Sequence, residues 1–188
     1  MVLQQKPLFI ISSPPCTAFS TLQNISKHKR DPEVVEAEKR AGIVHIKFCI
    51  ELYKIQLQHH WYFIHEHPSG ATSWQLPEII AIMAEPSVGA ALVDMCSYGM
   101  TALKNGKRGL VRKRTRLMSN SGEVLKRVAT VCSNVGKEEH LKHEHVPLDQ
   151  GSAKKAQVYP RGFVVNRYAR ESRHIRDWTN WGWKQCRY

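Results

Sequence analysis

The feature that most constrains this fold is a short apolar run that ends shortly before two consecutive prolines. The run, Leu8–Ile11, has no polar alternation, which is typical of a parallel strand buried on both faces. Pro14 and Pro15 cannot extend a sheet ladder, so the chain must leave the sheet there. Cys16 is thereby placed just past the carboxyl end of a strand, where open α/β sheets bind their ligands. The alternative is a buried structural cysteine in a proline turn.

A long amphipathic helix and two further strands are predicted next. Asp31 and Pro32 suit the cap and the first position of a helix, and apolar residues then recur at spacings of three and four. We expect a helix over residues 32–58 and strands near 61–64 and 88–93. The order strand, helix, strand forms a right-handed βαβ unit. The fold class predicted is α/β, with a partial Rossmann-like, mostly parallel sheet and flanking helices.

The second predicted strand runs into the titratable residues His65, Glu66 and His67. Since the carboxyl ends of parallel strands meet at one edge of a sheet, we expect Glu66 at the same edge as Cys16. We expect the two histidines, separated by one residue, to point to opposite faces of the strand and not to share a metal ion. The alternative for Glu66 is an ordinary solvated carboxylate.

Two of these motifs resemble the DNA cytosine-5 methyltransferases, and more closely the related reading frames of mobile elements and viruses. Pro15-Cys16 followed by Phe19-Ser20 resembles the nucleophile loop of that family. The residues 66–68, Glu-His-Pro, resemble its Glu-Asn-Val motif, although the asparagine is not matched.

A third motif extends the resemblance over about residues 7–118, the second half of the family's catalytic core. In the family a strand ending in Tyr-Gly precedes Gln-x-Arg-x-Arg. Here Tyr98-Gly99 is present, Arg112 stands in the place of the glutamine, and Arg114 and Arg116 match the two arginines.

The resemblance implies chemistry on an extruded cytosine. Cys16 would attack ring carbon six, Glu66 would hydrogen-bond ring nitrogen three, and S-adenosylmethionine would supply the methyl group. Arg114 and Arg116 would hold the base. The chain lacks the family's Gly-rich cofactor turn and its DNA-recognition domain. Either a partner chain supplies the cofactor half, or the fold has been kept without the reaction.

Charge predicts a polyanionic partner. The net charge is +12 and the pI is near 9.7, which favours nucleic acid over a membrane surface. The resemblance implies DNA rather than RNA. Asn105-Gly106 is a strong hairpin-turn signal. Five cations in and after this hairpin are predicted to contact nucleic acid: Lys104, Lys107, Arg108, Arg112 and Lys113. The alternatives are a basic strand edge that prevents aggregation and a non-catalytic ribonucleoprotein component.

Cysteine usage predicts a reducing compartment. The five cysteines are odd in number and none is spaced C-x-x-C, so a disulfide framework is not expected. With neither a signal peptide nor a membrane span in view, we expect an intracellular or virus-associated protein, in the cytoplasm or nucleus. Four residues offer zinc ligands without the spacing of a standard finger: Cys96, Cys132, His143 and His145. A polar loop is the alternative, and no metal is predicted.

Two domains are predicted. Residues 1–148 form the methyltransferase-like domain, with a strand over 111–118 and a helix over 122–131 in its last part. Residues 149–188 form a basic tail whose aromatics lie among arginines, which suits stacking on bases or docking on protein. The basic segment 23–31 is expected to meet phosphates or to be a solvated loop.

Overall fold

A computed structural model describes residues 2–21, 30–134, 136–139, 142–148, 158–160 and 163. The chain divides into unit 1, Met1–Val93 with Arg114–Ala129, and unit 2, Asp94–Lys113 with Thr130–Tyr188. The predictions for the basic segment 23–31 and for the aromatic tail fall almost wholly outside the described residues. The domain boundary at residue 148 therefore stays a prediction.

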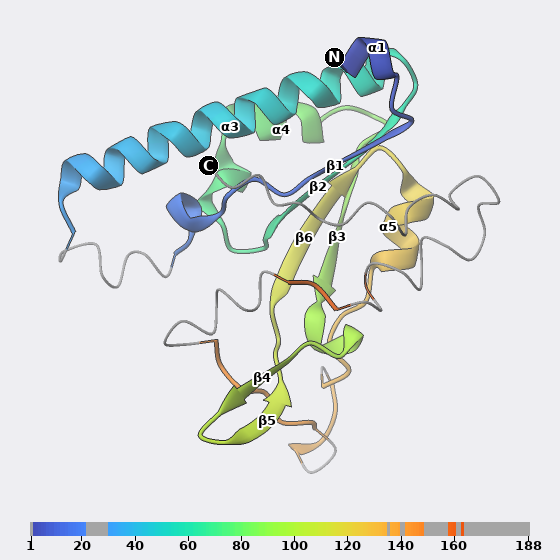
Figure 1. Ribbon diagram of the computed structural model, residues 1–188. Coiled ribbons are helices and arrows are strands. Elements are labelled where there is room, and N and C mark those ends of the chain that lie inside the picture. The colour runs from blue at the N-terminus through green and yellow to red at the C-terminus, as the bar shows by residue number, and fades with distance from the viewer. Residues whose placement is uncertain are drawn as a thin grey trace. The chain divides into compact units, whose positions relative to one another are not determined.

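Unit 1 is built on a four-stranded sheet of order β1-β2-β6-β3 (Figure 1). The strands are β1 Phe9–Ser12, β2 Tyr62–Pro68, β3 Gly89–Asp94 and β6 Arg114–Ser119. β1 and β2 are parallel, and β6 runs antiparallel to β2. β3 runs against β6 in turn, so β1, β2 and β3 all point the same way.

The α/β class and the three strands predicted to run in one direction are confirmed. The expectation of a mostly parallel sheet is wrong for neighbouring strands, because β6 lies between β2 and β3 and runs against both. The apolar runs of β2 and β3 indicate burial on both faces, but they do not indicate which strand lies alongside. β6 also begins at Arg114, three residues later than predicted.

The helices follow their sequence signals closely. α3 spans Pro32–Gln58 as predicted, and the side chain of its cap Asp31 accepts a hydrogen bond from the Glu33 amide at 2.8 Å. α5 is shorter than predicted and ends at Val128. The other helices are α1 Val2–Gln5, α4 Pro77–Met83, α5 Gly122–Val128 and the 3₁₀ helices η1 Thr17–Phe19, η3 Thr72–Gln75 and η4 Met95–Tyr98. No described helix is both long and apolar enough to cross a membrane.

The core of unit 1 lies between α3, α4 and β2. Tyr53 of α3 stacks on Phe63 of β2 with ring centroids 4.3 Å apart. Gln56, fully buried one turn later, donates to the carbonyls of Pro7 at 3.1 Å and Tyr62 at 2.6 Å. The helix therefore holds the starts of both parallel strands through one amide. The ion pair Lys47–Glu78, at 3.0 Å, joins α3 to α4.

β2 carries three consecutive buried polar residues. His65, Glu66 and His67 lie within the strand and not beyond its end. The expectation that the histidines point to opposite faces is wrong, because alternate residues of a strand return to the same face. Their ring centroids are 5.6 Å apart. His65 Nδ1 shares a hydrogen bond with the Tyr53 hydroxyl at 2.8 Å, and His67 Nδ1 shares one with Ser73 Oγ at 2.5 Å.

Unit 2 contains a two-stranded antiparallel hairpin of β4 Thr101–Lys104 and β5 Lys107–Leu110. The turn residues Asn105 and Gly106 have φ values of 51° and 75°. Positive φ at both central positions defines a type I′ turn, which matches the twist of the flanking strands. The predicted hairpin is confirmed.

Burial of His65 makes unit 1 sensitive to acid. Burial, aided by the neighbouring His67, lowers the pKa of His65 from 6.5 to about 3. The unfolded chain takes up this proton below pH 6.5 and the folded chain does not. The free energy of unfolding should therefore decrease as pH falls from 6.5 towards 3, by up to about 1.4 kcal/mol per pH unit. Urea unfolding at about pH 7 and about pH 5 measures this.

The exposed His59 provides the control for this measurement. His59→Ala should keep the pH dependence, whereas His65→Phe should lose the share that comes from the buried ring. An unfolding free energy that is the same at both pH values in the unmodified protein would contradict the neutral buried state of His65.

Candidate functional site

Cys16 follows β1 in a loop that is anchored on the core of unit 1. It is half-buried at the start of η1 and forms no disulfide. The Phe19 amide donates to the Cys16 carbonyl at 3.0 Å. The Phe19 ring is 2% exposed and meets the His67 ring edge-on at 5.8 Å. A Cβ placed on Gly42 would lie 2.9 Å from that ring, so α3 comes unusually close to the loop. Phe19 therefore fixes the position of the loop.

Glu66 contacts the loop that leads to Cys16. The β1–β2 register pairs Ser12 with His65, which sets Ser13 beside Glu66. The Ser13 hydroxyl donates a hydrogen bond to Glu66 Oε2. Glu66 is 6% exposed, and within the described part of the chain its Oε1 has no hydrogen-bond partner. One carboxylate oxygen is thus fixed and the other can accept a hydrogen bond.

Arg114 and Arg116 lie on the other face of the sheet from Glu66. In the β2–β6 register Leu117 lies opposite Glu66, and Arg116 lies opposite His67. Because side chains alternate along a strand, Arg114 and Arg116 share the face of His65 and His67. The Arg116 guanidinium lies 5.1 Å from the centre of the Trp74 ring. The structure joins Glu66 to the Cys16 loop and places these arginines elsewhere.

The hairpin of unit 2 carries the exposed cations. Lys107 and Arg108 are exposed, Lys104 is half-buried, and all three flank the Asn105-Gly106 turn. Arg108 Nη1 donates to Thr101 Oγ1 at 3.4 Å across the hairpin. The tip therefore presents positive charge on a backbone that cross-strand hydrogen bonds hold in register.

Arg112 and Lys113 have partners inside unit 2. Arg112 Nε lies 3.5 Å from Oδ2 of the fully buried Asp94. Lys113 Nζ donates to the Tyr159 hydroxyl at 2.8 Å and lies 4.3 Å from the centre of its ring. These two predicted nucleic-acid contacts also stabilise the unit.

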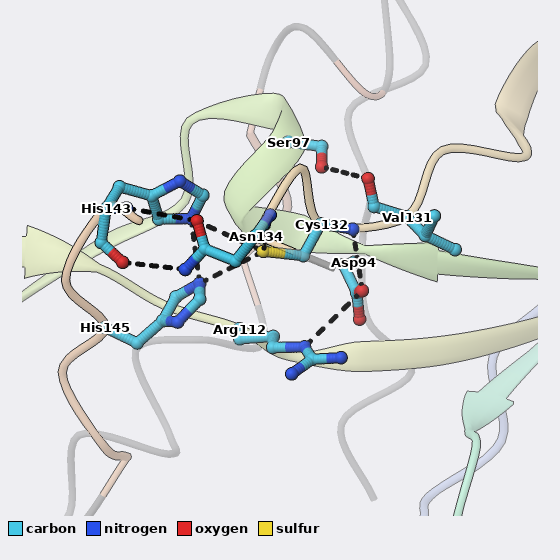
Figure 2. Close-up of polar contacts among 8 residues, drawn as sticks. All are labelled: Asp94, Ser97, Arg112, Val131, Cys132, Asn134, His143 and His145. Carbon is cyan, nitrogen blue, oxygen red and sulfur yellow. Dashed lines mark hydrogen bonds and ion pairs between the residues drawn. The ribbon is translucent and has the colours of Figure 1, made fainter. Parts of the chain in front are cut away.

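Unit 2 also gathers four potential metal ligands, for which the sequence predicted no metal. Cys96 belongs to η4, and the other three follow α5 in the chain. One ligand atom from each lies within 4.8 Å of all the others: Cys96, Cys132, His143 and His145. Cys132 Sγ lies 3.5 Å from His143 Nε2 and 3.6 Å from His145 Nε2 (Figure 2). The two Nε2 atoms are 2.9 Å apart. The sequence had offered these same four residues as potential zinc ligands, but their spacing is not that of a standard finger and a polar loop was the alternative.

Asn134 and Asp94 hold this cluster from outside. Asn134 Nδ2 donates to the His143 carbonyl at 2.8 Å, and the His143 amide donates to Asn134 Oδ1 at 3.0 Å. The backbone amide of Asn134 also donates to Cys132 Sγ, 3.4 Å away. Asp94 Oδ2 accepts from the Cys132 amide at 2.8 Å. The ligands are therefore positioned by backbone and side-chain hydrogen bonds.

Burial disfavours the charged forms of two members of the cluster, Cys96 and His145. Burial, together with the neighbouring Cys132 and Asp94, raises the pKa of the Cys96 thiol from 9.0 to about 11. Burial lowers the pKa of His145, with His143 and Arg112 acting in the same direction. Without a cation the cluster would hold a protonated Cys96 thiol and a neutral His145 ring.

Neither a protein-family model, nor a curated protein, nor a solved structure matches this chain.

The Ser13–Glu66 hydrogen bond gives a stability prediction. Ser13→Ala removes the hydroxyl that donates to Glu66 and leaves neither oxygen of this buried carboxylate with a hydrogen-bond donor. Unit 1 should therefore lose about 1–3 kcal/mol of unfolding free energy. Urea unfolding measures the loss. In a Glu66→Gln background the same Ser13→Ala change should cost less, because the group that remains is uncharged. Equal costs in both backgrounds would show that Ser13 does not act through Glu66.

Proposed function

We propose that this chain is a nucleic-acid-binding protein built on a cytosine-5 methyltransferase-like half-domain. The observation that carries the proposal is the basic hairpin of unit 2. In and around this hairpin, residues 95–113 of unit 2 include five Lys and Arg residues and no acidic residue. Cations that neutralise phosphates release counterions, which supplies most of non-specific affinity.

The form of the hairpin supports DNA as the partner. A two-stranded β-ribbon fits the major groove of B-form DNA, whereas the deep, narrow major groove of A-form RNA excludes it. Lys107 and Arg108 are exposed beside the turn and suited to phosphate contacts. Phosphate contacts position a protein without reading sequence, so weak sequence preference follows.

The parallel βαβ unit of unit 1 supports the methyltransferase-like assignment. β1, α3 and β2 form a βαβ unit with two parallel strands, the arrangement expected for the stretch that carries the Cys16 and Glu66 motifs. The resemblance of the Cys16 loop and of Glu66 falls on the first two strands of the same sheet.

Four described cysteines form no disulfide, which supports a reducing, intracellular compartment: Cys16, Cys49, Cys96 and Cys132.

Base-directed catalysis is the second candidate, and the hydrogen bond between Glu66 and the Cys16 loop favours it. For this candidate function, a partner chain is needed to bind the cofactor. β1 leads into Ser13-Pro14-Pro15, and β2 leads into Pro68-Ser69-Gly70. Neither turn has a run of glycines whose amides could cradle S-adenosylmethionine. The residues present do not fit the cofactor, and a partner chain would have to supply its half of the site.

Binding of a labelled oligonucleotide over a salt series tests the proposed function. Affinity should fall steeply as salt rises. The double variant Lys107→Ala/Arg108→Ala should weaken binding to all sequences alike. It should also reduce the salt slope by up to about 0.9 for each phosphate that the variant no longer neutralises.

A matched control exists on α3, where Lys39 and Arg40 form another exposed Lys-Arg pair. Lys39→Ala/Arg40→Ala removes the same net charge and should change binding much less. Equal losses of affinity in the two double variants would assign binding to net charge alone. Binding that does not depend on salt would contradict the proposal.

Calorimetry with S-adenosylmethionine tests whether the chain is self-sufficient as an enzyme. We expect no binding heat with the isolated chain, because no Gly-rich turn follows β1 or β2. Saturable binding would show that this chain carries its own cofactor site. Such a result would move the proposal from nucleic-acid binding to catalysis.

A further inference from the structure

We propose that unit 2 binds one structural zinc ion through Cys96, Cys132, His143 and His145. The four residues offer two sulfurs and two imidazole nitrogens, a common donor set for structural zinc. All four ligands come from the protein, which leaves no open position for a substrate. The site is therefore structural and not catalytic, and it is separate from the proposed nucleic-acid contacts.

The distances suit a tetrahedral ion. With zinc–sulfur bonds of about 2.3 Å and zinc–nitrogen bonds of about 2.0–2.1 Å, sulfur and nitrogen ligands lie about 3.6 Å apart. Cys132 Sγ is 3.5 Å and 3.6 Å from the two histidine Nε2 atoms. The two Nε2 atoms, at 2.9 Å, would have to open by a few tenths of an ångström from this position.

The orientation of the rings supports a common ligand. Both histidines turn the same nitrogen, Nε2, toward the Cys132 sulfur (Figure 2). In neutral rings a nitrogen without its proton is both a hydrogen-bond acceptor and a metal ligand. The backbone amide of Asn134, which donates to Cys132 Sγ, would stabilise a thiolate there. The competing arrangement is a hydrogen-bonded polar cluster without metal.

The ion would join three segments that flank the hairpin. Cys96 lies just before β4, and Cys132 follows α5 in the chain. His145 forms an isolated parallel β-bridge with Leu110, at the end of β5. The Val146 amide also donates to the Leu110 carbonyl at 2.8 Å. Apart from the two cysteines, the described part of unit 2 buries few apolar side chains: Met95, Met100, Val111 and Phe163. A core of this size gains stability from a metal.

The first experiment measures zinc in the full chain purified under reducing conditions. We expect about one zinc ion per chain. Cobalt substitution should give the visible bands of tetrahedral Co²⁺ and a thiolate charge-transfer band in the near ultraviolet. Cys132→Ser and His145→Ala should each lose most of the metal. The controls Cys16→Ser and His59→Ala change the same residue types in unit 1 and should keep it.

The second experiment locates the effect and keeps the proposal testable if a variant fails to fold. Zinc is removed from the unmodified protein with a chelator, and amide hydrogen exchange is followed. Exchange should speed up at Val111 and Val146, whose amides bond within unit 2, and should stay slow at Ile64 in β2. Returning zinc should restore protection. Zinc-free protein with unchanged exchange and no cobalt spectrum, or metal kept by Cys132→Ser/His145→Ala, would overturn the proposal.

Neither readout involves nucleic acid. A failure of the zinc proposal is therefore distinguishable from a failure of the proposed function.

Discussion

Three consecutive polar residues in β2 form the constraint on which the rest of unit 1 depends. His65, Glu66 and His67 are all buried, and a buried polar group without a partner costs about 1–3 kcal/mol. Their partners come from three different elements, α3, the loop after β1 and η3: Tyr53, Ser13 and Ser73. Hydrogen bonding therefore determines, together with apolar contact, how the helix and the cysteine loop pack on the sheet.

Local signals in the sequence predicted much of this fold, and non-local pairings were missed. The bounds of α3 followed from Asp31 and the apolar periodicity, and the hairpin followed from Asn105-Gly106. The place of β6 could not be read in this way, because a strand's apolar pattern reports burial and not its neighbour. The same holds for Arg114 and Arg116, whose sheet face depends on a register with a strand almost fifty residues earlier. The hydrogen bonds of Gln56 left no periodic signal at all.

The two candidate sites differ in how much of each could be predicted. Cys16 follows β1, and Glu66 lies in the second half of the adjacent parallel strand β2. Their proximity was therefore predictable, and the Ser13 hydrogen bond agrees with it. The metal-ligand cluster has no such local rule, because Cys96 and Cys132 are separated in the chain by β4, β5, β6 and α5. Residue types and spacing alone favoured a polar loop over a metal site. Only the fold shows that the four side chains converge.

The chain order of the sheet has a consequence for synthesis on the ribosome. β6 lies inside the sheet, yet it is the last of the four strands to be made, after the hairpin of unit 2. Until Ser119 has emerged, β2 and β3 each expose an unpaired edge, the kind of surface that invites pairing with another chain. The segment in between is rich in lysine and arginine and free of acids, so nascent chains at this stage repel one another. The same charges that suit a polyanion would thus protect the half-made sheet.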